Sequence, residues 1–284
     1  MKFPKKRKSL LVTLSVLLCA IALLTVIGPH LVLLSARQSE VADSYAYSEY
    51  FFNTYEQVRE NLQSRVAKLR NAGITVEVSE HAIDEADDLY IDNLYLPANK
   101  ENKNLIILTT GVHGMEGYIG SVMLDVFFEE IYPTLNPDTT GVLVVANVNP
   151  YGMKYKRRYN ENNVDLNRNF ILDWDSFDLS SNKDYPEVVN FLQPEGKIGN
   201  ALWHEVGFYA SLAKEAVTKG ADKVSDALLT GQYEYPAGVY YGGKGDEKST
   251  AYLKSVFQAC LEGEILPLHP CVGSYWHCCR RLGC

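Results

Sequence analysis

A histidine and a glutamate three residues apart are the first side chains in this sequence that could do chemistry. His113 and Glu116 lie in the glycine-rich stretch 111–117. An imidazole nitrogen and a carboxylate presented around one tight turn can bind the same Zn²⁺. Taken alone, the pair fits better an ordinary turn histidine and a helix-start glutamate stabilised by the helix dipole. The rest of the chain must decide between the two interpretations.

The elements around this turn place it where ligands bind in α/β proteins. Residues 104–110 form a short apolar run with β-branched side chains, which predicts a buried strand. Residues 118–132 have the apolar spacing of a helix, and residues 141–148 predict a second buried strand. Strand, helix and strand in this order predict a right-handed parallel crossover. The pair then lies at the carboxyl end of the first strand.

The segments before this unit complete one α/β domain. Residues 49–72 have helical spacing and stop before Gly73, a fitting C-terminal residue. Residues 74–78 and 89–96 alternate as strands do.

A second polar stretch follows the second strand. Residues 156–170 contain three arginines and five asparagines and have little periodicity. Such a loop is costly to order unless its polar groups find partners. Arginine offers a planar fork that suits carboxylates and polarised carbonyls. A solvated loop without a function is the other interpretation of this stretch.

Composition and the N-terminus narrow the class of protein. The net charge of −8 over 284 residues argues against nucleic acid as a partner, because no broad basic surface is available to neutralise phosphates. Residues 1–8 are strongly basic and residues 9–36 nearly all apolar, which predicts a signal peptide or signal anchor over 1–36. We expect the body of the protein to be membrane-anchored or secreted, outside the cytoplasm.

The motifs, in their order along the chain, resemble the zinc carboxypeptidase superfamily (carboxypeptidase A-like). They are most similar to a bacterial branch known only as a domain of unknown function. The resemblance implies an α/β fold with a mixed, mainly parallel sheet and helices on both faces, preceded by an N-terminal hydrophobic helix. It covers about residues 45–270. The motifs are His113-x-x-Glu116, Asn149-Pro150-x-Gly152, Arg157-Arg158, Val164-Asp165-Leu166-Asn167-Arg168-Asn169-Phe170, and the glycine- and tyrosine-rich segment 231–243.

The resemblance implies a zinc site. His113 and Glu116 would be its first two ligands, and His269, which follows an apolar run, the third. Two prolines beside His269 depart from the pattern of relatives, so an ordinary histidine in an irregular tail is the alternative. His204 and His81 are the competitors, but the first is expected on a helix surface and the second in a loop.

The resemblance also implies the groups that would hold the substrate. Arg158, or in second place Arg157, would polarise the scissile carbonyl and stabilise the oxyanion. Asn167 and Arg168 would bind a free carboxylate, Arg168 through a bidentate pair. The implied activity is a zinc-dependent carboxypeptidase-like hydrolase that cleaves an amide bond near the free carboxylate of a peptide or amide substrate.

The C-terminal residues depart most from the pattern. The general-base glutamate of the superfamily is expected well after the third ligand, yet fifteen residues follow His269 and none is acidic. Five of the six cysteines lie in the last 25 residues, and residues 271–284 have no helix or strand pattern. These observations predict an aberrant tail, of the kind a frameshift produces, an incomplete domain over 45–270 and weak or absent activity.

Two other functions stay open on the sequence. A related zinc amidase or deacylase would use the same residues on another amide or ester. A non-catalytic domain would keep the carboxylate-binding residues Asn167 and Arg168 without turnover.

Overall fold

The computed structural model describes residues 51–193 and 201–262. The chain divides into two compact units. One comprises residues 49–196 and 212–284, and the other residues 1–48 and 197–211. Of the second unit, the described residues are 201–211, which form the first part of helix α6 (Ala201–Lys219). The fold and the site below belong to the first unit.

A mixed sheet of four strands organises the described part of this unit. Its strands are β1 (Glu77–Asp84), β2 (Leu89–Leu96), β3 (Asn104–Thr109) and β4 (Thr140–Ala146), in the order β1-β2-β4-β3. The strands β3 and β4 pair in parallel, as the crossover predicted. The other two pairings, β1 with β2 and β2 with β4, are antiparallel.

The mixed sheet is therefore confirmed, but the expectation of a mainly parallel sheet is wrong for the described residues. The four residues between β1 and β2 are too few for a crossover, so these strands must form a hairpin. A parallel pair needs a connection of a dozen residues or more, which here contains α3 (Gly117–Val126) between β3 and β4.

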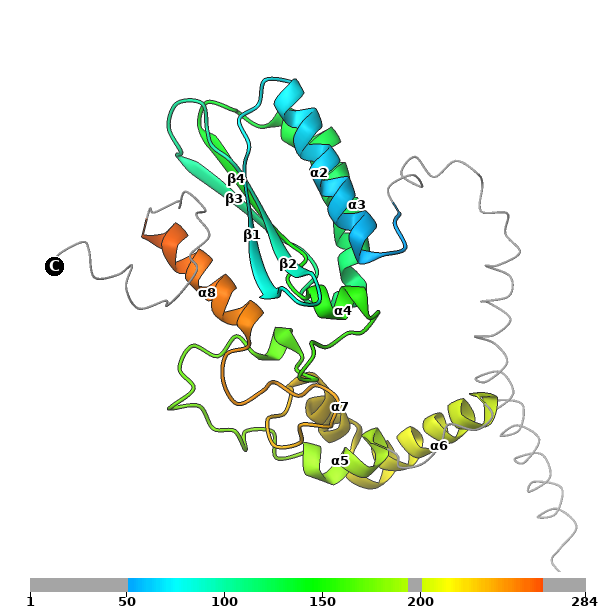
Figure 1. Cartoon of the computed structure of the whole chain (residues 1–284). Helices are drawn as coiled ribbons and strands as arrows, with labels where there is room; N and C mark the ends of the chain where they lie inside the picture. The colour runs from blue at the N-terminus through cyan, green and yellow to red at the C-terminus, as the bar shows by residue number, and fades with distance from the viewer. Residues whose placement is uncertain (1–50, 194–200, 263–284) are drawn as a thin grey trace, which may run out of the picture. The chain divides into compact units, whose positions relative to one another are not determined.

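Helices cover both faces of the sheet, as expected (Figure 1). Alternate residues of β4 show the division, because successive side chains of a strand point to opposite faces. Val142 and Val144 pack with residues of α2 (Tyr55–Asn71) and α3. Leu143 and Val145 pack with Leu253 and other residues of α8 (Lys248–Leu261). Full burial of each such side chain stabilises the fold by about 1.5–3 kcal/mol.

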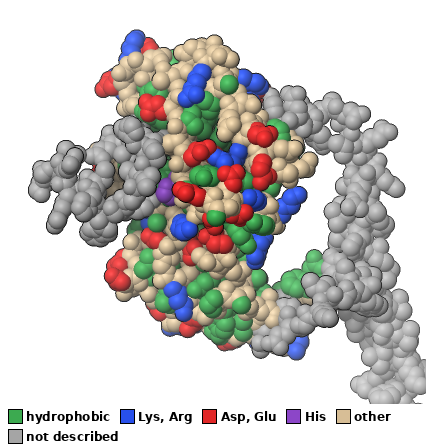
Figure 2. All heavy atoms as spheres, in the orientation of Figure 1, with side chains coloured by type: hydrophobic (Ala, Val, Ile, Leu, Met, Phe, Trp, Pro, Cys, Tyr) green, Lys and Arg blue, Asp and Glu red, His purple; other side chains and the backbone are tan. Residues whose placement is uncertain are grey.

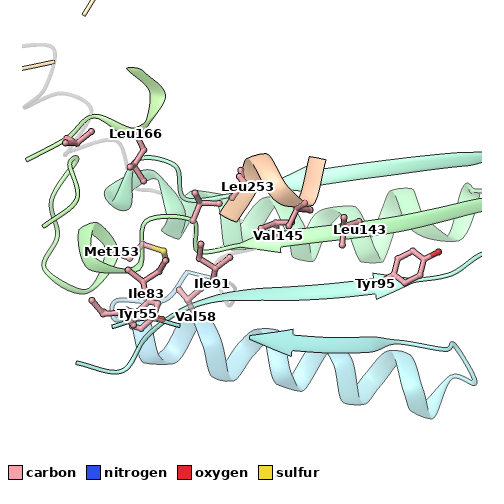
Figure 3. Close-up of a cluster of buried hydrophobic side chains, with 14 of the residues drawn as sticks. Tyr55, Val58, Ile83, Ile91, Tyr95, Leu143, Val145, Met153, Leu166 and Leu253 are labelled. Atoms are coloured by element: carbon pink, nitrogen blue, oxygen red, sulfur yellow. The ribbon is translucent and has the colours of Figure 1, made fainter. Parts of the chain in front are cut away.

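The core on the α8 face continues to the loops that carry the polar motifs. Figure 3 shows Leu253 and Val145 in the middle of this cluster, with Leu143 on one side of them and Met153 and Leu166 on the other. Met153 belongs to the short helix α4 (Pro150–Lys154), and Leu166 to a single 3₁₀ turn, Leu166–Arg168. Because both side chains are almost completely buried, they fix the segments 149–154 and 164–169 to the sheet.

Helix boundaries follow local chemistry. The α2 helix begins after Thr54, whose hydroxyl accepts a hydrogen bond from the Gln57 amide at 3.2 Å, rather than at residue 49. It ends before Gly73, which has a φ of 80°. The α3 helix ends at Val126 and continues as one π-helical turn, Phe127–Ile131, and one 3₁₀ turn, Tyr132–Thr134.

The first strand lies further along the chain than the sequence predicts. The predicted range is 74–78, whereas β1 spans Glu77–Asp84. The residues of β1 are mostly polar, so the apolar alternation was weak. Its register comes from the hairpin with β2, in which Glu77 pairs with Tyr95 and His81 with Ile91.

Three further helices lie after the polar loop. The α5 helix spans Tyr185–Leu192, α6 spans Ala201–Lys219, and α7 spans Ala221–Leu229. Val188, Val224 and Ala227 form a small separate core, with Leu212 packed against it. In the part of the chain that the structure describes, no helix is long and apolar enough to cross a bilayer. The signal or anchor predicted over residues 1–36 lies outside the described residues.

The surface agrees with an acidic chain. Acidic side chains gather near the middle of the face seen in Figure 2, with a few basic ones among them.

Candidate functional site

The turn after β3 is built on glycines that admit no larger residue. Gly111 has a φ of 74°, in the left-handed region that favours glycine. A Cβ on Gly114 would lie 2.0 Å from the carbonyl carbon of Gly152, so the two backbones touch. This contact explains the Asn-Pro-x-Gly motif. Asn149 caps α4 by accepting a hydrogen bond from the Gly152 amide at 2.8 Å, and Gly152 then meets the turn.

The structure brings His113 and Glu116 together. The Nδ1 atom of His113 lies 3.0 Å from Oε1 of Glu116. The imidazole is buried, whereas the Glu116 side chain is 62% exposed. The pair therefore presents one nitrogen and one carboxylate at the solvent side of the turn.

A third residue, Asp165, forms a hydrogen bond with the other nitrogen of the imidazole. Its Oδ1 lies 2.9 Å from Nε2 of His113, and its side chain is completely buried. The Asp165 amide donates to the Tyr241 carbonyl at 2.7 Å, and its Oδ1 also accepts from the Asn167 amide at 3.0 Å. A carboxylate on the far nitrogen fixes the orientation of a metal-binding histidine, so this arrangement leaves Nδ1 for a ligand.

His113, Glu116 and Asp165 form one cluster, and its charges shift the pKa values of His113 and Asp165. The hydrogen bond to Asp165 is the main cause that raises the pKa of His113 above its usual value, and Glu116 adds to it. Burial alone would raise the pKa of Asp165. The hydrogen bond from His113 and the positive charges of His113, Arg158 and Arg168 outweigh burial and hold this pKa below its usual range.

Arg158 contacts both carboxylates of the cluster. Its Nη1 donates to Oε1 of Glu116 at 3.4 Å, and its Nε donates to Oδ2 of Asp165 at 3.3 Å. Its carbonyl accepts from the amide of Gly114 at 3.2 Å, which ties the arginine to the turn. Arg157 is exposed, and its amide donates to the Gly152 carbonyl. Of the two arginines that the sequence left open, Arg158 is the one whose side chain contacts the pair.

Asn167 and Arg168 follow directly in the 3₁₀ turn that Asp165 caps. The Asn167 side chain is exposed. The guanidinium of Arg168 donates to the carbonyls of Leu229 at 3.0 Å and Asn167 at 3.2 Å. It lies near enough to Asp165 to lower the pKa of that carboxyl. Arg168 therefore lies beside the cluster and is oriented by backbone carbonyls.

The donor chemistry of the pair suits zinc. Two ligands of a tetrahedral zinc ion, each about 2.0–2.1 Å from the metal, lie about 3.3 Å apart. The 3.0 Å between His113 Nδ1 and Glu116 Oε1 is close to this separation. Within 51–193 and 201–262, no three His, Cys, Asp or Glu side chains are arranged to hold a metal ion together. The described residues would thus supply two ligands, and His269, the expected third, lies outside them, as does the tail 271–284.

The competing histidines belong to the strand β1 and the helix α6. His81 is in β1, not in a loop as expected, and its ring stacks on Tyr252 of α8 with centroids 3.8 Å apart. Burial lowers its pKa. His204 is in α6, in agreement with the helix expected around it.

Sequence reasoning missed Asp165 and Tyr240 as members of the site. Asp165 lies in a quoted motif, two residues before Asn167, but the motif gave no sign that its carboxylate meets His113. The ring of Tyr240 lies 5.9 Å from the guanidinium carbon of Arg158. Only folding brings segment 231–243 to the arginine.

The similarity of this chain to solved structures is weak. Bovine thrombin-activatable fibrinolysis inhibitor, in complex with tick carboxypeptidase inhibitor, is 18% identical over 43% of this chain and 45% of its own, with a TM-score of 0.31. A structure of thrombin-activatable fibrinolysis inhibitor (TAFI) is 17% identical over 64% and 49%, with a TM-score of 0.34. The chain thus spans about half the length of these structures, and such scores do not establish a common fold.

No curated protein matches the sequence. One protein family matches it. The family described as "Protein of unknown function (DUF2817)" matches residues 51–267, which include the polar stretches 111–117 and 156–170 and segment 231–243. Because this match covers most of the sequence, the chain belongs to the DUF2817 family.

Proposed function

We propose that this chain is a zinc-dependent, carboxypeptidase-like hydrolase that acts on an amide bond near a free carboxylate. The observation that carries the proposal is the imidazole of His113, held on one nitrogen by buried Asp165 and facing Glu116 with the other. A histidine oriented by a carboxylate and paired with a second ligand is typical of zinc sites.

Zinc would be held by His113 and Glu116, with His269 as the proposed third ligand. The chemistry that zinc supplies at such a site is activation of a water molecule and polarisation of a carbonyl. Within the described residues, β3 is one of the two edge strands of the sheet. A strand added there in parallel would end beside His113, because the carboxyl ends of parallel strands meet at one edge.

The protein side chains around this position have distinct tasks in the proposal. Asp165 accepts a hydrogen bond from Nε2 of His113 and so keeps the imidazole in one orientation and one tautomer. Arg158 carries guanidinium donors next to both carboxylates, where it can donate to an oxygen that becomes negative during amide cleavage. Loss of one such donor typically costs about 10²–10³ in rate.

Asn167 and Arg168 are the proposed binding residues for the free carboxylate of the substrate. Arg168 is already oriented by the carbonyls of Leu229 and Asn167. A guanidinium held in this way loses less conformational freedom when it binds a carboxylate.

Zinc binding is the first test. One zinc per chain should bind to the 284-residue protein in a chelator competition, and His113→Ala should abolish this binding. His81→Ala is the matched control, since it removes a histidine that stacks on Tyr252 outside the cluster. Zinc should also raise the unfolding temperature of the protein and of the control, but not that of His113→Ala. Equal zinc binding by His113→Ala would contradict the proposed site.

Hydrolysis is the second test. Hydrolysis by the chain with zinc should be weak, as predicted from the sequence, but an N-acyl amino acid should be cleaved faster than the same compound with its carboxylate converted to an amide. A chelator should stop both reactions. Arg168→Lys should reduce the preference for the free carboxylate, whereas Arg157→Lys should not. Carboxylate binding without turnover, unchanged by His113→Ala, would instead support a non-catalytic binding domain.

We further propose, from the basic and apolar pattern of residues 1–36, that the protein is membrane-anchored or secreted. Fractionation of cells that express the full chain tests this. Recovery of the protein in the cytoplasmic fraction would contradict the proposal.

A further inference from the structure

Tyr240 has a backbone conformation that a tyrosine rarely adopts. Its φ of 58° lies in the left-handed region, which is costly for a residue with a bulky side chain. Such a conformation persists only where the surroundings impose it. Here the Tyr240 amide donates to the hydroxyl of Tyr159 at 3.0 Å, and its carbonyl accepts from the Gln232 amide at 3.0 Å. Both backbone groups of the residue are thus fixed.

This backbone carries the Tyr240 ring to Arg158. The ring centroid lies 5.9 Å from the guanidinium carbon, within the range of a cation–π contact. The next residue, Tyr241, accepts the hydrogen bond of the Asp165 amide at 2.7 Å. The strained residue is therefore connected to the candidate site through its side chain and through its neighbour.

The ring differs from the other partners of Arg158. Those partners are the carboxylates of Glu116 at 3.4 Å and Asp165 at 3.3 Å. In the proposed function Glu116 is a metal ligand, and Asp165 already binds His113 at 2.9 Å. Each carboxylate is shared with a second group, whereas the ring of Tyr240 competes with neither a metal nor the histidine.

We propose that Tyr240 is a positioning residue that holds the guanidinium of Arg158 in place to bind an oxyanion. Its left-handed backbone is retained because it directs the ring at this arginine. The role of the arginine toward an oxyanion rests on the proposed function, but the contact between ring and guanidinium does not.

The contact is tested with two variants of the full chain. Tyr240→Gly removes the ring and suits the left-handed backbone, so it should fold. Tyr240→Phe keeps the ring and is its matched control. In ¹⁵N-arginine-labelled protein, the Nε–H signal of Arg158 is assigned by its loss in Arg158→Lys. Tyr240→Gly should move this signal downfield by removing the ring-current shift, and Tyr240→Phe should leave it in place. An unmoved signal in Tyr240→Gly would overturn the contact.

The positioning role is tested with inorganic phosphate as the oxyanion probe on the chain with zinc. Tyr240→Gly should weaken phosphate binding about two- to fivefold, and Tyr240→Phe should bind as the parent chain does. In an Arg158→Gln background the effect of Tyr240→Gly should disappear, because the ring acts through the arginine. Equal loss in that background, or no loss in Tyr240→Gly alone, would overturn the role.

The two proposals fail in different ways. If no variant binds zinc, the proposed function is contradicted, while the arginine signal still decides whether the ring holds Arg158. If zinc binds and the Arg158 signal is the same in Tyr240→Gly as in the parent chain, the positioning role is contradicted and the zinc site is not.

Discussion

The imidazole of His113 has a carboxylate on each of its nitrogens, and the two carboxylates differ in their surroundings. Asp165 is fully buried and fixed by backbone hydrogen bonds, whereas Glu116 is mostly exposed on a short turn. A ligand that approaches from solvent can therefore separate His113 from Glu116 without disturbing Asp165. At the scale of single residues, this asymmetry makes Nδ1 the nitrogen that would bind a metal in the proposed function.

Replacement of Asp165 by Asn tests this selection. Asn keeps an oxygen for the Asn167 amide but loses the charge that raises the pKa of His113 and orients it. We expect zinc affinity to fall about 10–100-fold, measured by competition with a chelator. Asp87→Asn, at a partly exposed carboxylate that binds Lys154 and Tyr155, is the control and should leave the affinity unchanged. Unaltered affinity in Asp165→Asn would show that the buried carboxylate does not orient the histidine.

At the scale of elements, the site depends on how the turn after β3 meets α4. The two segments touch backbone to backbone at Gly114 and Gly152, and the cap residue Asn149 also donates to the Arg158 carbonyl at 3.2 Å. The short helix therefore holds the histidine turn and the arginine in one assembly.

Gly114→Ala should break this assembly. The added Cβ has no room, so the turn must shift, and we expect a loss of about 1–3 kcal/mol in the free energy of unfolding together with weaker zinc binding. Gly207→Ala is the control, because a Cβ there meets no atom within 4 Å and alanine favours the α6 helix by about 1 kcal/mol. Urea denaturation measures both variants. Equal stability of Gly114→Ala and the parent chain would contradict the close contact.

A buried ion pair joins the two helices on one face of the sheet. Arg65 of α2 donates to Oδ1 of Asp125 of α3 from Nε at 3.1 Å and from Nη2 at 2.8 Å, and both side chains are buried. Since α3 follows the histidine turn directly, this pair also fixes the direction in which the turn leaves β3.

Among the described residues, Asp125→Ala would leave Glu129, which is 36% exposed, as the ionic partner of the Arg65 guanidinium. We expect the free energy of unfolding to fall by up to about 3–5 kcal/mol, because the buried guanidinium keeps only its partly exposed partner. Lys100→Ala is the control, since Lys100 pairs with Asp138 on the exposed surface, where such a pair contributes about 0–1 kcal/mol. A loss in Asp125→Ala no larger than in the control would mean that solvent reaches Arg65.

At the scale of the whole molecule, we expect buried tyrosines to give stability a dependence on alkaline pH. Tyr185 is completely buried at the start of α5, and burial raises its pKa to about 12 from 10.0. The unfolded chain loses this proton first as the pH rises. The contribution is therefore complete below pH 10 and is lost progressively between pH 10 and about pH 12.

Tyr185→Phe isolates this contribution. Between pH 10 and 12 the stability of the variant should fall less steeply than that of the parent chain, as measured by urea denaturation at several pH values. Parallel slopes would show that Tyr185 ionises as easily in the folded as in the unfolded state.

The sequence predicted much of the sheet and part of the site. The strands β2, β3 and β4 and the parallel pairing of β3 with β4 were found because their side chains follow the periodicity of buried strands. The strand β1 was displaced, because its side chains are largely polar and its partner, not its own pattern, sets its register.

The sequence by itself determined the types of side chain available to the site and the turn that carries His113 and Glu116, because both depend on residues close together in the chain. Tertiary structure decided that Arg158 rather than Arg157 meets them, that Asp165 orients the imidazole, and that Tyr240 lies against the arginine. These contacts join residues that are 42, 52 and 82 positions apart in the chain. Periodicity and spacing describe neighbours along the chain, whereas such contacts arise only when the sheet and its loops pack.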